Sequence, residues 1–213
     1  MELFGTAGIR GGVDERVTPE LALSVGRAAG GDGEEFVVGY DGRVTSPALA
    51  DAVASGLESA GAYVVRVGQV PTPALAYASR GRRGVMVTAS HNPPTDNGLK
   101  LFVDGQEYDE EAERAVERRV ESENSQAGWD AWGDTVAEAV LPAYRHAVAD
   151  YARGFGADPD RLTVAVDCGN GTASVGTPQV LRAIGADVLA TEANVDGHFP
   201  ARESKPTPET LST

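Results

Sequence analysis

Apolar and polar positions along the chain follow two alternating periods, which predict strands and helices in turn. Short apolar runs typical of buried strands end in polar turns; these runs are residues 35–40, 63–67, 84–88, 99–103, 162–167 and 187–190. Between them lie segments of helical spacing, which begin at the cap-and-proline pairs Thr18-Pro19, Ser46-Pro47 and Thr72-Pro73. This alternation predicts an α/β layer fold, largely parallel, with helices packed on the sheet.

The middle of the chain is more polar, and it predicts two helices separated by a loop. Residues 109–123 carry many charges around a narrow apolar stripe, which is typical of a solvated helix. Residues 124–133 predict a surface loop whose two tryptophans tuck into the body, and residues 134–153 predict a second helix. Pro142 is expected to kink that helix or to mark a restart, because proline lacks the backbone N–H that a helix interior needs.

A change of pattern at residues 154–160 predicts a domain boundary, with one domain over 1–155 and a second, incomplete one over 156–213. The second part offers two strands and one helix, which are too few to bury an independent core. We therefore expect the sequence to be a fragment of a longer protein. Its incomplete second domain is expected to expose a strand edge through which the fragment self-associates.

Composition narrows the possible partners and the cellular location. The 213 residues have a net charge of −14, and only Lys100 and Lys205 are lysines. Such a surface argues against nucleic acid and membranes as partners, and its composition is typical of adaptation to a salty, halophilic cytoplasm. A single cysteine and a start without signal-peptide features favour a cytoplasmic protein.

A serine stands on the loop that follows the apolar run 84–88, and basic residues are available around it. Lys100 lies where the chain becomes regular again, while Arg10 and Arg43 come from turns earlier in the sequence. Because the carboxyl ends of strands form the active rim of such sheets, Arg43 and Ser90 are expected at one edge. Basic groups around a hydroxyl suit phosphoryl transfer, although a loop-capping serine stays open as the alternative.

Other serine chemistries fit this loop less well. The hydrolase elbow needs glycine two positions before and after the serine, where this chain has Thr88 and Asn92. His91 is adjacent to Ser90 and cannot readily turn back to take its proton. No phosphate-binding loop of the Walker type is present in the sequence either. A hydrolase is therefore disfavoured.

Five motifs, in order along the whole chain, resemble those of the α-D-phosphohexomutases, a superfamily that includes phosphoglucomutase, phosphomannomutase and phosphoglucosamine mutase. The motifs are residues 4–11, 39–43, 88–93 with 97–100, 166–171, and 196–200 with 206–209. Tyr40 and Gly42 depart from the second motif, which is usually Gly-Arg-Asp-Thr/Ser-Arg. The resemblance implies a layered mixed sheet with helices on both faces, followed by a partial second α/β domain.

The resemblance also implies an isomerase of carbohydrate metabolism that interconverts hexose 6-phosphate and hexose 1-phosphate. Ser90 is implied to carry the phosphoryl group as a phosphoprotein and to exchange it through a hexose 1,6-bisphosphate intermediate. Lys100 is the candidate for proton transfer, Arg10 contacts the phosphoserine region, and His91 orients the phosphate. A simpler role for His91, shaping the loop, stays open.

Three further residues complete the implied phosphate- and substrate-binding set: Thr6, Arg43 and Asn92. For Arg43 a structural ion pair with Asp41 is the alternative. The family's Mg²⁺ is implied to bind the phosphate on Ser90 together with an Asp-Gly-Asp-x-Asp-Arg loop that this sequence does not contain. Third and fourth domains are missing as well, so the fragment alone is expected to be nearly inactive.

The sequence does not identify the sugar. Phosphomannomutase and phosphoglucomutase activities are the first expectation, and phosphoglucosamine mutase is the alternative that shares the same serine motif. A non-enzymatic phosphosugar-binding or regulatory module is the alternative of a different class.

Overall fold

The main body is a mixed sheet in a computed structural model that describes residues 3–5, 8–32, 35–122, 126–156, 159–203, 205 and 207–208. Seven strands form this sheet in the order β1-β5-β4-β2-β3-β7, with β6 beside β5. Their bounds are β1 (Ile9–Gly12), β2 (Glu35–Tyr40), β3 (Tyr63–Gln69), β4 (Arg83–Val87), β5 (Asp96–Val103), β6 (Gln106–Glu107) and β7 (Thr135–Ala137).

The sheet is parallel in one half and antiparallel in the other. Strand β2 pairs in parallel with β3 and β4, and β3 pairs in parallel with β7. Strand β5 pairs antiparallel with β1, β4 and β6. The connection from β4 to β5 is too short for a crossover and therefore forces antiparallel pairing. The mixed sheet is confirmed, whereas a largely parallel arrangement holds only for the half that contains β2.

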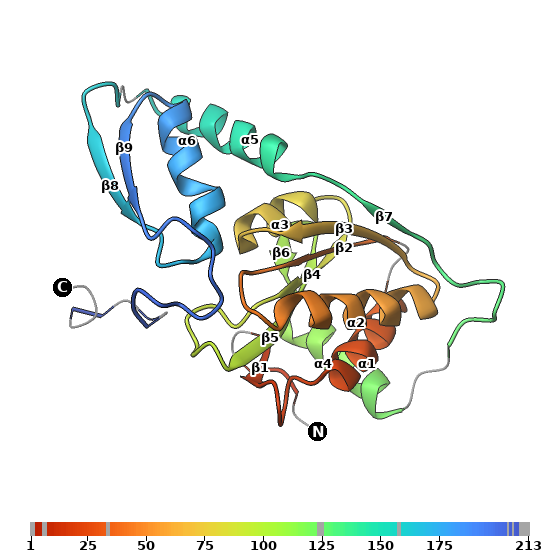
Figure 1. The fold of residues 1–213 in the computed structure, drawn as a ribbon. Helices are drawn as coiled ribbons and strands as arrows, with labels where there is room; N and C mark the ends of the chain where they lie inside the picture. Colours follow the sequence, from red (N-terminus) through yellow and green to blue (C-terminus); the bar gives the residue numbers. More distant parts are fainter. Residues whose placement is uncertain are drawn as a thin grey trace.

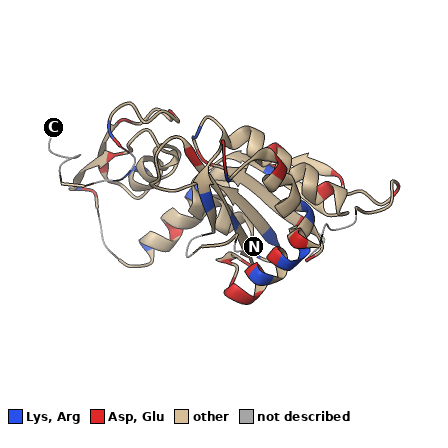
Figure 2. Ribbon diagram, turned by 90° about the horizontal axis from the view of Figure 1, so that it is seen from below, with Lys and Arg blue, Asp and Glu red and all other residues tan. Residues whose placement is uncertain are grey.

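Helices cover both faces of this sheet, as Figure 1 shows. Helices α1 (Pro19–Gly30), α2 (Ser46–Ser59) and α4 (Glu110–Glu121) share one buried apolar cluster with strand residues such as Phe36 and Val38. Helices α3 (Thr72–Ala78) and α5 (Leu141–Arg153) border a second cluster, which contains Val37. Successive residues of β2 thus point to opposite faces, and both faces are buried. Acidic and basic segments are interspersed on the outside of the helices (Figure 2).

The structure corrects two expectations for residues 124–153. Residues 135–137 form strand β7 beside β3, so a helix over all of 134–153 is wrong. The helical part begins at Leu141 with Pro142 in its first turn, which confirms the restart at that proline. Trp129 and Trp132 are 92% and 52% exposed and do not tuck into the body.

Main-chain contacts explain why the tryptophan loop stays outside. The N–H of Ala127 donates to the carbonyl of Ser59 at 2.9 Å, and the N–H of Gly133 donates to that of Glu58 at 2.8 Å. A Cβ on Gly133 would lie 1.8 Å from the carbonyl oxygen of Ala62. The loop is therefore held at the end of α2 through its backbone, which leaves the indole rings in solvent.

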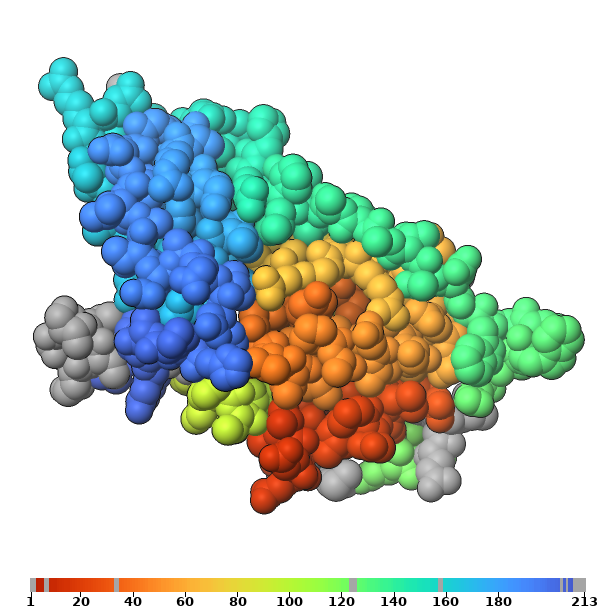
Figure 3. Space-filling model, viewed as in Figure 1, coloured from red at the N-terminus to blue at the C-terminus, as the bar shows by residue number. Residues whose placement is uncertain are grey.

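A smaller unit follows α5 and lies at one end of the body (Figure 1). It consists of β8 (Thr163–Asp167), η1 (Thr172–Val175), α6 (Thr177–Ala183) and β9 (Asp187–Thr191). Strands β8 and β9 pair in parallel, and each alternates exposed with half-buried residues. The two strands and one helix are as predicted. In the space-filling view the chain near residue 195 rests on the loop that follows β4 (Figure 3). Over the part of the chain described here, no helix is long and apolar enough to cross a membrane.

Candidate active site at the Ser90 loop

The loop that carries Ser90 begins at the carboxyl edge of the parallel half of the sheet. Strands β2 and β4 are parallel neighbours, so their ends meet at one edge. Asp41 follows β2, and its N–H donates to the carbonyl of Val87 in β4 at 3.0 Å. The predicted proximity of the turn at Arg43 and the loop at Ser90 is therefore confirmed.

Ser90 itself is exposed and has an unusual backbone conformation. Its φ of 58° lies in the left-handed region, which is costly for a residue with a Cβ. The N–H of Ser90 donates to Oγ1 of Thr88 at 3.0 Å, and that hydroxyl donates to Oδ2 of Asp41 at 2.6 Å. This chain of hydrogen bonds holds the strained turn and presents the Ser90 side chain at the surface.

Asp41 is the centre of the hydrogen bonds that hold the loop. Its Oδ1 accepts from Oγ of Ser46 at 2.7 Å and from the backbone N–H of Arg43 at 2.9 Å. Its Oδ2 accepts from Thr88 and from Nε of Arg43, the latter at 3.2 Å. Both carboxylate oxygens are therefore engaged in holding the loop in place.

Arg43 holds the loop from inside, and it is 1% exposed. Its Nε pairs with Asp41, which is the ion pair expected as the alternative role. Its two Nη groups donate to four loop carbonyls: Pro93 at 2.5 Å, Asp96 at 2.9 Å, Ser90 at 3.0 Å and Asn92 at 2.8 Å. These bonds use all five guanidinium donors. Burial lowers the pKa of Arg43, and the charge of Asp41 opposes that shift.

Arg10 lies in β1, which pairs with β5 in the antiparallel half of the sheet. It is paired in register with Gly98, and a Cβ on Gly98 would lie 3.0 Å from Cγ of Arg10. The carbonyl of Gly98 accepts from the N–H of Thr88 on the other side. The missing side chain at Gly98 thus gives Arg10 room to approach the loop. Among the residues that the structure describes, the Nε of Arg10 is buried and has no hydrogen-bond partner.

Lys100 lies two residues along β5 from Gly98 and therefore points to the same face. Its Nζ forms an ion pair with Glu107 at 2.5 Å, and its side chain is 12% exposed. A Cβ on Gly8 would lie 3.0 Å from Cγ of Lys100. The N-terminal segment therefore covers the stem of this lysine. Glu107 was not singled out by the sequence pattern, because it lies in a charged segment.

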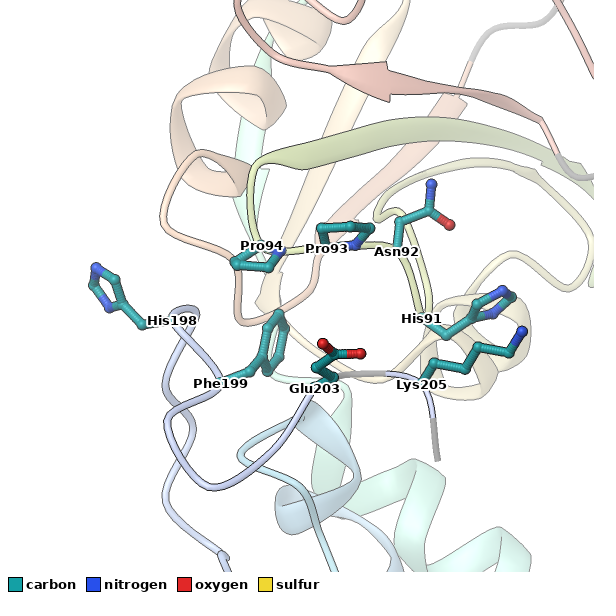
Figure 4. A pocket seen from close by; sticks show the side chains of 8 residues that line it. All are labelled: His91, Asn92, Pro93, Pro94, His198, Phe199, Glu203 and Lys205. Carbon is teal, nitrogen blue, oxygen red and sulfur yellow. The ribbon is translucent and has the colours of Figure 1, made fainter. Parts of the chain in front are cut away.

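A cavity of about 570 Å³ lies between the Ser90 loop and four residues near the end of the chain, His198, Phe199, Glu203 and Lys205. Figure 4 shows Lys205 beside His91, and the Phe199 ring facing Pro93 and Pro94. The His198 side chain points away from the cavity in that view. The cavity is therefore lined by both apolar and charged groups.

Of the other predicted residues, Asn92 braces the loop and Thr6 lies outside the described residues. The Nδ2 of Asn92 donates to Oδ2 of Asp96 at 2.9 Å. The structure thus places Ser90, His91 and Asn92 on one loop that Arg43 holds through its carbonyl groups. Arg10 and Lys100 lie on the neighbouring strands β1 and β5. Thr88 and Asp41 were not proposed as site residues, although both stand in motifs that the sequence made visible.

The described residues do not form a magnesium site by themselves. Over those residues no three His, Cys, Asp or Glu side chains lie close enough to hold a metal ion. Mg²⁺ requires near-octahedral coordination by oxygen atoms, which one serine-linked oxygen cannot supply. The two carboxylate oxygens of Asp41 are already occupied by hydrogen bonds.

Family comparison gives matches over nearly the whole chain. Residues 1–127 match the model of phosphoglucomutase/phosphomannomutase α/β/α domain I, and residues 143–213 match that of domain II. The second match begins inside α5.

Individual relatives agree with the family matches. A phosphopentomutase of Thermococcus kodakarensis is 46% identical over 217 residues, covering 100% of this chain and 47% of the relative. A protein of Methanopyrus kandleri named a probable phosphoglucosamine mutase is 44% identical, covering 98% and 47%. A solved phosphoglucomutase/phosphomannomutase family protein of Burkholderia thailandensis superimposes with a TM-score of 0.81 at 30% identity, covering 93% and 45%. The chain thus spans about half the length of the relatives it matches.

Proposed function

Because this chain belongs to the phosphoglucomutase/phosphomannomutase family, we propose that its Ser90 carries the phosphoryl group of a sugar-phosphate mutase. The whole protein would interconvert hexose 6-phosphate and hexose 1-phosphate through a hexose 1,6-bisphosphate. The observation that carries the proposal is the exposed Ser90 in a left-handed turn, held by Thr88, whose own N–H donates to Gly98, the residue paired in register with Arg10.

The transfer follows from the groups around the loop. The bond from Ser90 Oγ to phosphorus forms while the bond from phosphorus to the sugar oxygen breaks, and the serine proton passes to the departing oxygen. Lys100, whose ammonium group pairs with Glu107, is the proposed proton carrier: it would give a proton to the departing oxygen and then take up the proton of Ser90. Arg10 stabilises the charge on the phosphoryl oxygens, which is where such a transition state gains most of its stabilisation.

Three more residues have proposed roles at the phosphate. His91 would orient it from the cavity wall, and Asn92 lies beside His91 in the same wall. Thr6 lies outside the described residues, and its role at the phosphate is proposed from its motif alone. Arg43 receives a different role from the one its motif implied. Since its donors are all engaged, we assign it to the shape of the loop and not to contact with the substrate.

Mg²⁺ belongs to the proposal only as a ligand of the phosphorylated serine. When bound, it would neutralise charge on the phosphoryl group, and its other ligands lie outside the described residues. Hexose 1,6-bisphosphate is the proposed intermediate and activator. Neither is needed for the roles given above to Arg43 and Asp41.

The sugar is a separate question, because the relatives carry different names. The phosphopentomutase at 46% identity favours a pentose phosphate as a second candidate substrate, and the Methanopyrus relative favours glucosamine phosphate as a third. The first test is therefore a panel of the 1-phosphates of mannose, glucose, glucosamine and ribose, assayed with the full-length protein.

Further properties proposed for the chain concern its organisation and surroundings. We propose a phosphoserine-bearing domain over residues 1–155 and an incomplete second domain over 156–213, with self-association through the exposed strands of the latter. A cytoplasmic location with high salt is proposed from the net charge of −14.

Intact mass spectrometry tests the central proposal. We expect incubation with glucose 1,6-bisphosphate and Mg²⁺ to add about 80 Da to the full-length wild-type protein, the mass of one phosphoryl group. Ser90→Ala should show no gain, whereas Thr95→Ala, which removes another exposed hydroxyl of the same loop, should gain the mass normally. A gain that persists in Ser90→Ala would contradict the proposal. Sugar-phosphate binding by the full-length protein without mass gain or turnover would instead indicate a binding module.

A further inference from the structure

We propose that Arg43 is a positioning residue whose hold on the Ser90 loop depends on Phe199, so that docking of the smaller unit sets the order of the loop. The consequence for phosphoryl transfer rests on the function proposed above. The coupling itself is a property of the structure and can be measured without any substrate.

The loop depends on Arg43 because one side chain gathers four of its carbonyl groups. Between Ser90 and Asp96 the chain forms few backbone bonds of its own: Asn92 donates to Ala89 at 3.2 Å, and Asp96 donates to Pro93 at 3.0 Å. The planar guanidinium spans carbonyls at both ends of the loop. A lysine at this position could not do so, because its donors radiate from a single nitrogen.

The smaller unit packs directly against the turn that contains Arg43. A Cβ on Gly42 would lie 2.4 Å from Cγ1 of Val195, and a Cβ on Gly197 would lie 2.5 Å from the carbonyl oxygen of Gly42. Gly197 therefore allows the two backbones to meet, and Gly42 makes room for the Val195 side chain. The Phe199 ring lies over Arg43, with Cζ 5.3 Å from the ring centroid.

The segment that carries Phe199 is anchored to the glycine-rich turn after β8. The N–H of Asp196 donates to the carbonyl of Asn170 at 2.9 Å, and Nδ2 of Asn170 donates to the carbonyl of Asn194 at 3.2 Å. Asn170 is 1% exposed and has a φ of 57°, so this turn is itself tightly fixed. Phe199 also has a left-handed φ of 50°. Displacement of the unit would therefore move the ring that covers Arg43.

The ring protects the hydrogen bonds of Arg43 from water. A cation held over an aromatic face is stabilised most when it is desolvated, and carbonyl acceptors bind a guanidinium best when water does not compete. Phe199 also faces Pro93 and Pro94 at the loop tip (Figure 4). It therefore lies over the side chain that holds the loop and faces the loop itself.

Amide hydrogen exchange on the whole 213-residue chain tests the coupling. The reporters are the amides of Ser90, Asn92 and Asp96, each of which donates within the loop. We expect Phe199→Leu, which keeps an apolar side chain but removes the ring face, to speed exchange at these amides about tenfold. Arg43→Lys should have a larger effect at the same amides. Exchange in β3 should stay at the wild-type rate in Phe199→Leu.

Two matched controls separate this coupling from a general loss of stability. Phe155→Leu alters a phenylalanine that is 72% exposed, and Arg114→Lys alters an arginine on the outside of α4. Both should leave the loop at the wild-type exchange rate. Wild-type loop exchange in Phe199→Leu would overturn the coupling, and wild-type loop exchange in Arg43→Lys would overturn the positioning role. An equal increase in the Phe155→Leu control would also overturn the coupling.

A second measurement links the loop to chemistry. If the wild type gains the phosphoryl mass, Phe199→Leu should gain it about fivefold more slowly but to the same final extent, because orientation affects rate. An unchanged rate despite faster exchange would overturn the link to transfer. Failure of the wild type to gain mass would count against the proposed function alone, because the exchange experiment uses no substrate.

Discussion

Tyr108 shows how the fold tunes a single ionisable group away from the site. It follows β6 and is 6% exposed, with its hydroxyl 2.6 Å from Nη1 of Arg83 and 3.4 Å from Oδ2 of Asp32. Burial raises the pKa of Tyr108 to about 12, and the negative charge of Asp32 adds to that shift. Folding therefore favours the protonated, neutral form of the Tyr108 side chain.

The shift predicts a loss of stability at high pH. The tyrosine of the unfolded chain releases its proton near pH 10, whereas that of the folded chain keeps it to about pH 12. The contribution of Tyr108 to the free energy of unfolding is therefore complete below pH 10 and is lost between pH 10 and about 12. At about pH 11 the loss should be about 1.4 kcal/mol. We expect the difference in unfolding free energy between wild type and Tyr108→Phe to shrink by that amount from pH 9 to 11, measured by urea denaturation. A constant difference across this range would contradict the shift.

At the level of residues, the sequence motifs predicted which segments meet at the sheet edge better than they predicted the contacts of single side chains. The serine motif and the turn at Arg43 were both visible, and both lie at the predicted edge. Local sequence could not show that the donors of Arg43 point inward, because their acceptors lie about 50 positions further along the chain. The ring that covers Arg43 comes from still further away, at Phe199.

At the level of elements, helices α1 and α2 pack closely at two glycines, Gly26 in α1 and Gly56 in α2. A Cβ on Gly26 would lie 2.3 Å from the carbonyl oxygen of Val53, and a Cβ on Gly56 would lie 2.2 Å from that of Leu23. The atoms in the way belong to the backbone, so no side chain can move aside. This close contact places both helices against the face of the sheet that contains Phe36 and Val38.

Gly56→Ala is therefore expected to destabilise the protein, although alanine has the higher helix propensity. We expect a loss of about 3 kcal/mol, at the upper end for overpacking, because two helix backbones must separate. Chemical denaturation measures it. Gly31→Ala at the end of α1 is the control, since a Cβ there meets its nearest atom at 3.7 Å. A stability equal to wild type in Gly56→Ala would show that the helices can shift without cost.

The elements with a clear apolar pattern were predicted from sequence, whereas strand β7 was not. Helices α1 and α2 and strands β2 and β4 appear where their apolar spacing placed them. Strand β7 has three exposed residues and gains its conformation from pairing with β3, so its own sequence carries no alternation to detect. The loop before it is likewise fixed by main-chain bonds to α2, which leave no sequence pattern.

At the level of the whole molecule, acidic charge is the dominant feature of the surface. The net charge is −14, and like charges crowd the first turns of α4. There, burial raises the pKa of Glu113, and repulsion from Glu117 and Glu107 raises it further. A carboxylate with a raised pKa favours folding at low pH and opposes it as the pH rises, so at neutral pH this cluster costs stability.

Salt should reduce the loss of stability that this repulsion causes. Raising KCl from about 0.1 to 2 M shortens the Debye length from about 10 Å to a few ångströms, which screens repulsion between exposed acids. We expect the Tm to rise on the order of 5 °C, equivalent to about 2 kcal/mol for a chain of this size. Differential scanning fluorimetry in KCl measures the rise, and a series in sorbitol controls for general solvent exclusion.

Glu113→Gln removes one member of the cluster. It should therefore raise the Tm in low salt and flatten its dependence on KCl. A Tm that is flat or falls between these salt concentrations would show that charge repulsion does not limit the stability of this molecule, and would remove the physical basis for adaptation to a salty cytoplasm.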